Sequence, residues 1–319
     1  MRIVFLGTPE FAIKSLDTLV KSRHQVVAVI TQPDKPNARG NKVVPSEVKL
    51  YAIEHDIPVY QFMKISRDGV ETLKDLKPDL MITAAYGQIL SQQVIDIPKY
   101  GIINVHASLL PKYRGASPIQ SAVIAGETKT GITIMQTDIG LDTGDILMQK
   151  AVDILPTETS GDVANKLSVL GAEMLLEVVN SIENGTVLKV KQNHTNATFT
   201  KKINKSDCAI NWNKSATQLR SLIMGANPEP IATTEVNGQI LKIYTAAVAE
   251  IKSDEEAQPG TILNISSAKS GVFVQTGNGI LSLGYVQLPG GKVLEAKQLI
   301  SGRKLSVGDV CKQILQTEI

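Results

Sequence analysis

The feature that most constrains the fold is an alternation of short, almost wholly apolar runs with amphipathic helical patterns. Residues 2–6 form the first apolar run, a helical pattern follows at 11–20, and a second apolar run follows at 26–30. A strand, a helix and a strand in this order predict parallel strands joined by a right-handed crossover. Strands without polar alternation are buried on both faces, as in a doubly wound sheet.

The same alternation continues to about residue 186. We therefore predict a first α/β domain over residues 1–186, built on a doubly wound, mostly parallel, Rossmann-like sheet. Its further predicted elements are helices at 46–55, 118–125 and 159–182 and strands at 80–84, 102–105, 131–136 and 146–153.

The chain changes character after this domain. Residues 187–205 contain five lysines and neither Asp nor Glu, so we predict a basic linker over 187–206. Two interpretations stay open: a solvated connector, or a strip that follows a phosphate backbone.

Short strand-like runs, separated by turns rich in Gly, Pro and Asn, dominate the last third of the chain. Such spacing predicts a small, OB-like β-barrel over residues 207–319, with one helix at 216–224. The predicted strands are 240–244, 261–265, 271–276, 279–283 and 293–296.

Composition excludes several classes of protein. Of 319 residues, 43% are hydrophobic and 20% charged, which is enough apolar material for a core and argues against disorder. A formal net charge of +2 gives no bulk argument for nucleic-acid binding. Cys208 and Cys311 are the only cysteines, and no apolar run approaches the roughly 20 residues that span a bilayer. We expect a cytoplasmic protein without disulfides or membrane segments.

Polar residues at a predicted strand end identify a candidate site. Ligands of open α/β sheets bind beyond the carboxyl ends of the strands, where Asn104 and His106 lie. Two residues apart, they face the same side if the strand continues through 106. Asp142 follows in an acidic turn, Gly140 to Asp145, which a surface hairpin would also explain.

Absent motifs narrow the chemistry further. The chain contains no GxGxxG after the first strand, no P-loop, no GxSxG and no Cys/His spacing typical of zinc. Asn, His and Asp side chains polarise carbonyls and move protons but include no strong covalent nucleophile. The pattern favours direct group transfer without a metal.

A longer segment around the candidate site supports a family assignment. Residues 103–115, Ile-Asn-Val-His-Ala-Ser-Leu-Leu-Pro-Lys-Tyr-Arg-Gly, together with Asp142 in a Leu-Asp-Thr-Gly turn, resemble the formyltransferases that use 10-formyltetrahydrofolate. Within that family, the chain resembles the branch that formylates methionyl-initiator-tRNA for translation initiation. This resemblance covers nearly the whole chain. It includes Phe5 to Ala12, the loop that begins at Thr31, and Gly302 to Leu305.

The resemblance implies roles for particular residues. Asn104 and a protonated His106 would donate hydrogen bonds to the formyl oxygen. Asp142 would favour the imidazolium and carry the amine proton through water to the leaving nitrogen. The folate would lie along Ser108, Leu109, Leu110 and Pro111, near residues 84–92. The implied acceptor contacts are Arg39 and Lys42 at the acceptor stem and the linker and C-terminal domain along the tRNA backbone. Phe11 would contact the methionine, although ordinary core packing would explain it equally well.

Two further questions remain open from sequence. A carboxylate beside His106 would raise its pKa and burial would lower it, and the Leu110–Pro111 bond could be cis or trans.

The rival functions are a formyltransferase for a small amine, such as glycinamide ribonucleotide or an amino sugar, and a non-catalytic tRNA- or folate-binding protein. Neither a basic loop at 33–42 nor an added domain suits the first rival.

Overall fold

The computed structural model describes residues 1–36, 43–251, 256–264 and 271–314. Its contacts divide the chain into two compact units, each assembled from several segments, and each is considered by itself. The first unit contains 1–118, 130–152 and 164–200, and the second contains 119–129, 153–163 and 201–319. The domain boundaries near 186 and 206 stay a prediction.

A seven-stranded sheet forms the centre of the first unit. The spatial order is β10-β9-β7-β6-β1-β2-β5. The five strands from β7 to β5 are parallel to one another, whereas β9 runs antiparallel to β7. The strands are β1 (Arg2–Gly7), β2 (Gln25–Thr31), β5 (Val59–Gln61), β6 (Leu80–Ala84), β7 (Ile102–His106), β9 (Lys129–Gln136) and β10 (Ile146–Asp153).

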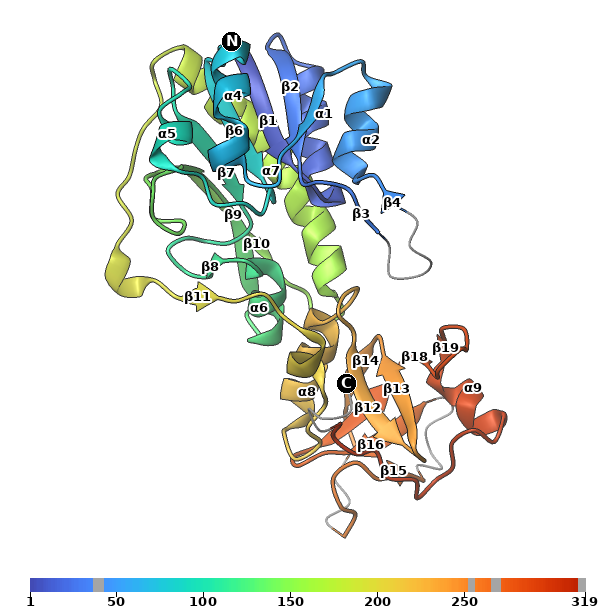
Figure 1. Cartoon of the computed structure of the whole chain (residues 1–319). Helices are drawn as coiled ribbons and strands as arrows, with labels where there is room; N and C mark the ends of the chain where they lie inside the picture. Colours follow the sequence, from blue (N-terminus) through green and yellow to red (C-terminus); the bar gives the residue numbers. More distant parts are fainter. Residues whose placement is uncertain (37–42, 252–255, 265–270, 315–319) are drawn as a thin grey trace. The chain divides into compact units, whose positions relative to one another are not determined.

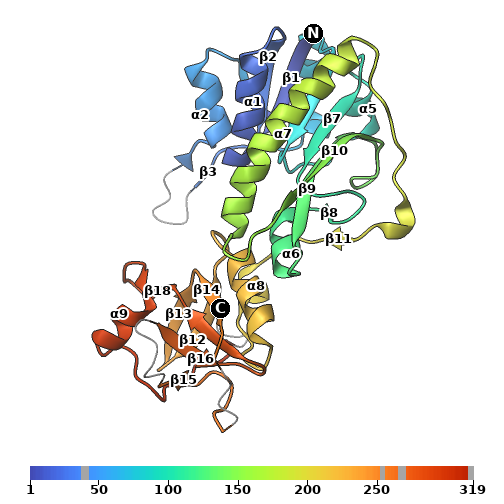
Figure 2. The same cartoon turned by 180° about the vertical axis from the view of Figure 1, so that it is seen from behind.

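Helices cover both faces of this sheet, as the all-apolar strands require (Figures 1 and 2). On one face, α7 lies so close to β7 that a Cβ added at Gly171 would meet Val105 Cγ1 at 2.9 Å. On the other, apolar side chains of α3, α4 and α5 form one buried cluster with Val4 and Leu6 of β1. The helices are α1 (Ile13–Val20), α2 (Glu47–Glu54), α3 (Ile65–Asp68), α4 (Val70–Leu76), α5 (Gln92–Ile95) and α7 (Ser160–Glu183).

The predicted α/β fold is confirmed. Every strand and helix expected in residues 1–186 is present, with ends shifted by at most two residues. Before the first helix, Glu10–Ala12 is a 3-10 turn. Sequence reasoning missed β5 and helices α3 to α5, which are short. The small strand pairs β3 (Lys35–Pro36) with β4 (Val43–Val44), and β8 (Arg114–Gly115) with β11 (Phe199–Thr200), were also missed.

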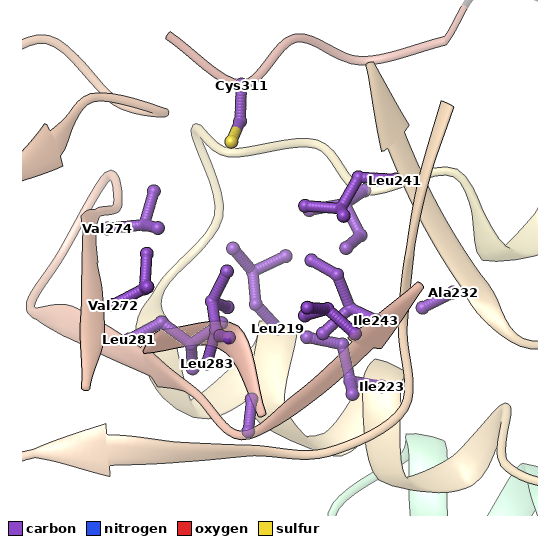
Figure 3. Packing of buried hydrophobic residues seen from close by; sticks show 14 of the residues in the cluster. Leu219, Ile223, Ala232, Leu241, Ile243, Val272, Val274, Leu281, Leu283 and Cys311 are labelled. Atoms are coloured by element: carbon purple, nitrogen blue, oxygen red, sulfur yellow. The ribbon is translucent and has the colours of Figure 1, made fainter. Parts of the chain in front are cut away.

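Two four-stranded antiparallel sheets form the second unit, in the orders β12-β13-β18-β19 and β14-β17-β16-β15. Side chains from both sheets and from α8 enter one core, among them Leu219, Ile243 and Leu283 (Figure 3). The elements are α6 (Pro118–Ile124), α8 (Ala216–Gly225), β12 (Ala232–Val236), β13 (Gln239–Ile243), β14 (Ala246–Ala249), β15 (Ile262–Leu263), β16 (Val272–Gln275), β17 (Ile280–Leu283), β18 (Tyr285–Gln287), β19 (Leu294–Glu295) and α9 (Ala296–Ser301).

The predicted helix of this unit begins where its sequence allows it to begin. Ser215 and Gln218 form a capping box at the start of α8, which satisfies backbone N–H groups that the first turn leaves free. The strand predicted at 293–296 is shorter, because Ala296 already opens α9. Among the described residues, no helix is long and apolar enough to cross a membrane.

Candidate active site

The carboxyl ends of β1, β2, β5, β6 and β7 share one edge of the sheet, and Asn104 and His106 lie in the last three residues of β7 at that edge. Positive φ occurs at two non-glycine residues in loops at this edge, Ala85 after β6 and Tyr113 after β7. It also occurs at Asp142, in the turn between β9 and β10, whose side chain contacts His106 and Gly115. This left-handed conformation costs about 1 kcal/mol or more outside glycine and clusters at functional sites. The edge is therefore the place to examine for chemistry.

Asn104 lies in β7 with its side-chain amide oriented by the neighbouring strand. Thr83 of β6 is its partner in the sheet register, and Thr83 Oγ1 donates to Asn104 Oδ1 at 3.0 Å. The bond commits the oxygen of the amide to the protein. The NH₂ group, for which no acceptor is found within the described parts of the chain, remains available to donate to a ligand oxygen.

His106 ends β7 and is buried, with 5% of its surface exposed. Its Nε2 lies 3.0 Å from the backbone oxygen of Tyr113. Since a carbonyl oxygen only accepts hydrogen bonds, Nε2 carries the proton and donates it. In the neutral ring, Nδ1 is then the nitrogen that can accept a proton.

Asp142 lies beside that nitrogen. Its Oδ2 is 3.7 Å from Nδ1 of His106 and accepts a hydrogen bond of 2.7 Å from the backbone N–H of Gly115. Burial lowers the pKa of His106, the carboxylate of Asp142 and the hydrogen bond to Tyr113 oppose the shift, and the positive charge of Arg114 adds to it. Of these effects burial is the largest, so the pKa of His106 lies below its ordinary value and the neutral ring is favoured.

The Ser108–Pro111 segment is held firmly from beneath. Thr133 Oγ1 donates to the backbone oxygen of Ser108 and accepts from the backbone N–H of Leu110, at 2.7 and 3.1 Å. Gln149 donates to the backbone oxygen of Leu110 at 2.9 Å, and the Leu110–Pro111 bond is cis. The hydrogen bonds of Thr133 and Gln149 therefore fix the backbone of the segment next to His106.

The structure brings Asn104, His106, Asp142 and Ser108–Pro111 to one edge, as the sequence predicted. Phe11 follows β1 at the same edge and is half-buried. The tentative acceptor contacts Arg39 and Lys42 lie outside the described residues. Roles for all of these side chains remain predictions.

Sequence reasoning missed three residues that shape the site: Thr83, Arg114 and Gln192. The sequence does not distinguish Thr83, because threonine is common in strands. Gln192 lies in a segment whose only sequence signal is its positive charge. Arg114 stands in the sequence only as one residue of the segment 103–115, yet it is 2% exposed. A buried arginine needs partners, and nothing in the sequence says which. Over the described ranges, no group of three or more His, Cys, Asp or Glu side chains could hold a metal ion.

Two family patterns together match most of the chain. The pattern of the family described as formyl transferase matches residues 1–179, and that of the formyl transferase C-terminal domain matches 202–304. The methionyl-tRNA formyltransferase of Acetivibrio thermocellus is 45% identical over 98% of this chain and 100% of its own. That of Alkaliphilus metalliredigens is 44% identical over 97% of each chain.

A solved structure shares the fold at lower identity. The sugar 3N-formyl transferase WlaRD, determined with dTDP and 5-N-formyl-THF, superposes with a TM-score of 0.67 at 20% identity, covering 92% of this chain and 99% of its own. This likeness speaks for the fold alone. The full-length relatives and both family patterns lead to one conclusion: the chain is an enzyme that belongs to the family of the methionyl-tRNA formyltransferases.

Proposed function

We propose that this enzyme transfers the formyl group of 10-formyltetrahydrofolate to the α-amine of methionyl-initiator-tRNA. Support for the acceptor comes from the full-length relatives, which are methionyl-tRNA formyltransferases. Support for the donor comes from the folate in the structure of the sugar formyltransferase. The observation that carries the chemistry is the meeting of an amide donor, a neutral imidazole and a carboxylate at one sheet edge.

Asn104 is proposed to stabilise the oxyanion. When the amine attacks the formyl carbon, the carbonyl oxygen becomes negatively charged, and the free NH₂ group of Asn104 donates to it. The hydrogen bond from Thr83 keeps the amide from turning its own oxygen toward that charge. An oxyanion donor of this kind is worth on the order of 10²–10³ in rate.

His106 and Asp142 are proposed to move the proton. The neutral amine forms a C–N bond with the formyl carbon and becomes positively charged. It then passes a proton toward Nδ1 of His106, through Asp142 or a water molecule. As the tetrahedral carbon collapses, the bond to N10 of the folate breaks and the same proton goes to that leaving nitrogen, giving tetrahydrofolate and formylmethionyl-tRNA.

The structure modifies one detail of the expected roles. His106 was expected to donate directly to the formyl oxygen in its protonated form. Nε2 is already bound to the carbonyl of Tyr113, so only Nδ1 is free to exchange a proton. We therefore assign His106 mainly as a proton acceptor, whose positive charge in the transition state also favours the oxyanion.

Substrate contacts follow from the arrangement of the loops. The folate is proposed to lie along Ser108–Pro111, with its pterin near residues 84–92, and Phe11 to contact the methionine. Arg39 and Lys42 are proposed to reach the acceptor stem. The basic segment 187–206 and the C-terminal unit are proposed to follow the tRNA backbone by charge.

A formylation assay tests donor and acceptor together. The purified chain is incubated with 10-formyltetrahydrofolate and, in parallel, with methionyl-initiator-tRNA, methionyl-elongator-tRNA, glycinamide ribonucleotide and a nucleotide-linked amino sugar. We expect rapid transfer to the initiator tRNA and little to the small amines. Preferred transfer to a small amine would establish the rival formyltransferase, and folate binding without turnover on any acceptor would establish a binding protein.

A further inference from the structure

The basic segment after α7 returns to the active site instead of leaving it. Val190 pairs with Ile146, and β11 pairs with β8 in parallel. The backbone oxygen of Thr198 accepts from the N–H of Arg114 at 2.9 Å, and Thr198 Oγ1 accepts from the N–H of Tyr113 at 2.8 Å. This segment is therefore bonded to the loop that carries the carbonyl partner of His106.

Gln192 is the buried centre of that contact, with 5% of its surface exposed. Its Nε2 donates to the backbone oxygens of Asp142 and Gly144 at 2.9 and 2.8 Å. Its Oε1 accepts from Nη2 and Nε of Arg114 at 2.6 and 3.2 Å. Both amide hydrogens and the amide oxygen are thus used, so the side chain has one orientation.

Arg114 connects Gln192 to the loop next to the reacting groups. The guanidinium is buried, and its other hydrogen-bond partner is Nδ1 of His194, at 3.0 Å. The next peptide N–H along the chain, that of Gly115, binds the carboxylate of Asp142. The Gln192 side chain therefore binds the backbone of the Asp142 turn. Through Arg114 it also holds the loop whose Gly115 N–H binds the Asp142 carboxylate.

We propose that Gln192 is a positioning residue for formyl transfer: it holds the Asp142 turn and the Arg114 guanidinium in register around His106. This inference rests on the proposed roles of Asp142 and His106. Gln192 touches neither substrate nor reacting atoms, so its effect is on the alignment of those groups. A misplacement of about 1 Å at a reacting centre can cost roughly 100-fold in rate.

Two substitutions separate the two halves of the contact. Gln192→Met keeps the length of the side chain and removes every hydrogen bond. Gln192→Glu keeps an acceptor for Arg114 but removes both donors to the Asp142 turn. The matched control is Gln275→Met, because Gln275 is a glutamine of equal burial in the second unit, 5% exposed.

For Gln192→Met we expect kcat to fall about 10- to 100-fold, with KM for folate and for methionyl-tRNA within about threefold of wild type. For Gln192→Glu we expect a similar fall, because the turn is released. The new carboxylate also neutralises Arg114, whose charge disfavours the imidazolium, so the acid limb of the kcat profile moves to higher pH. A structural role alone would not move this limb.

The outcome that overturns the proposal is a pair of folded Gln192 variants with wild-type kcat and an unmoved acid limb. It is equally overturned if kcat per folded molecule is unchanged and only stability falls, as expected for Gln275→Met. Wild-type enzyme and Asp142→Asn are assayed alongside. An inactive wild type, or an active Asp142→Asn, would place the failure in the proposed function and not in Gln192.

Discussion

The carboxylate of Asp142 lies 3.7 Å from Nδ1 of His106, while Nε2 of the same ring lies 3.0 Å from the backbone oxygen of Tyr113. The backbone oxygen of Tyr113 therefore accepts the proton on Nε2, and the carboxylate of Asp142 would stabilise a second proton on Nδ1. Burial lowers the pKa of the ring and favours its neutral form, whereas the carboxylate favours the charge that the ring would gain as the reaction proceeds. The relationship determines what substitution of either partner should do.

Asp142→Asn should lower kcat by about 10²–10⁴, the usual range for a group that moves protons in a transition state. The amide keeps the size of the side chain and can still accept from Gly115, so the fold should persist. Single-turnover formylation measures the rate, and circular dichroism checks the fold. As a control, Asp153→Asn changes a mostly exposed carboxylate and should leave kcat unaltered. Near-wild-type turnover by folded Asp142→Asn would exclude the proposed proton transfer.

Thr83→Val tests the orientation of Asn104. The substitution keeps the shape of the side chain and removes the hydroxyl that binds Asn104 Oδ1. The loss of one hydrogen bond worth roughly 1 kcal/mol lets the amide turn, and kcat should fall about five- to tenfold. Asn104→Ala, which removes the donor itself, should cost on the order of 10²–10³.

The control for this pair is Thr234→Val in the second unit. Thr234 is fully buried, and its hydroxyl accepts from Trp212 and donates to the backbone of Lys312. Its removal should lower thermal stability without changing kcat. If Thr83→Val also lowered only stability, orientation of the amide would have no part in catalysis.

The sequence predicts the parts of the site that depend on strand periodicity. His106 and Asn104 are two residues apart in a strand, so their common face and common edge follow from geometry alone. The α/β fold follows in the same way, because the apolar runs of β1, β2, β6 and β7 and the helical period of α7 are long enough to recognise. Short elements such as β5 and α5 carry too few residues to show a period.

What sequence could not predict depends on contacts between distant segments. Gln192 meets Arg114 and the Asp142 turn only because the chain returns to the sheet edge after α7. The pKa of His106 is another example, since burial and a neighbouring carboxylate act in opposite directions. Only the depth of the ring and the separation of 3.7 Å decide which effect prevails.

The protonation of His106 gives a direct test of that balance. Because burial lowers its pKa, the ring in the free enzyme should titrate below 6.5, the ordinary value. The neutral form is favoured by folding, so stability is fully present above about pH 6.5 and declines as the pH falls below it. Proton NMR of the C2–H signal, assigned by its loss in His106→Asn, measures the titration.

Asp142→Asn sharpens this measurement. Removing the carboxylate removes the attraction that opposes burial, so the pKa of His106 should fall further. A signal that titrates above 6.5 in wild type would mean that the carboxylate outweighs burial. The ring would then be charged in the resting enzyme and could not act as the proton acceptor.

Binding of the tRNA should depend steeply on salt if the basic segment follows its backbone. Each lysine–phosphate contact contributes roughly 0.7–0.9 to the slope of log affinity against log salt concentration. In Lys202→Ala with Lys205→Ala, two exposed positive charges of the segment are removed, so the slope of log KM for methionyl-tRNA should decrease by about 1–2. The control, Lys74→Ala with Lys99→Ala, removes the same charge around a surface depression at the amino ends of β6 and β7. Steady-state kinetics across a potassium chloride series distinguishes the pairs: equal slopes for both would mean that net charge, and not the basic segment, attracts the tRNA.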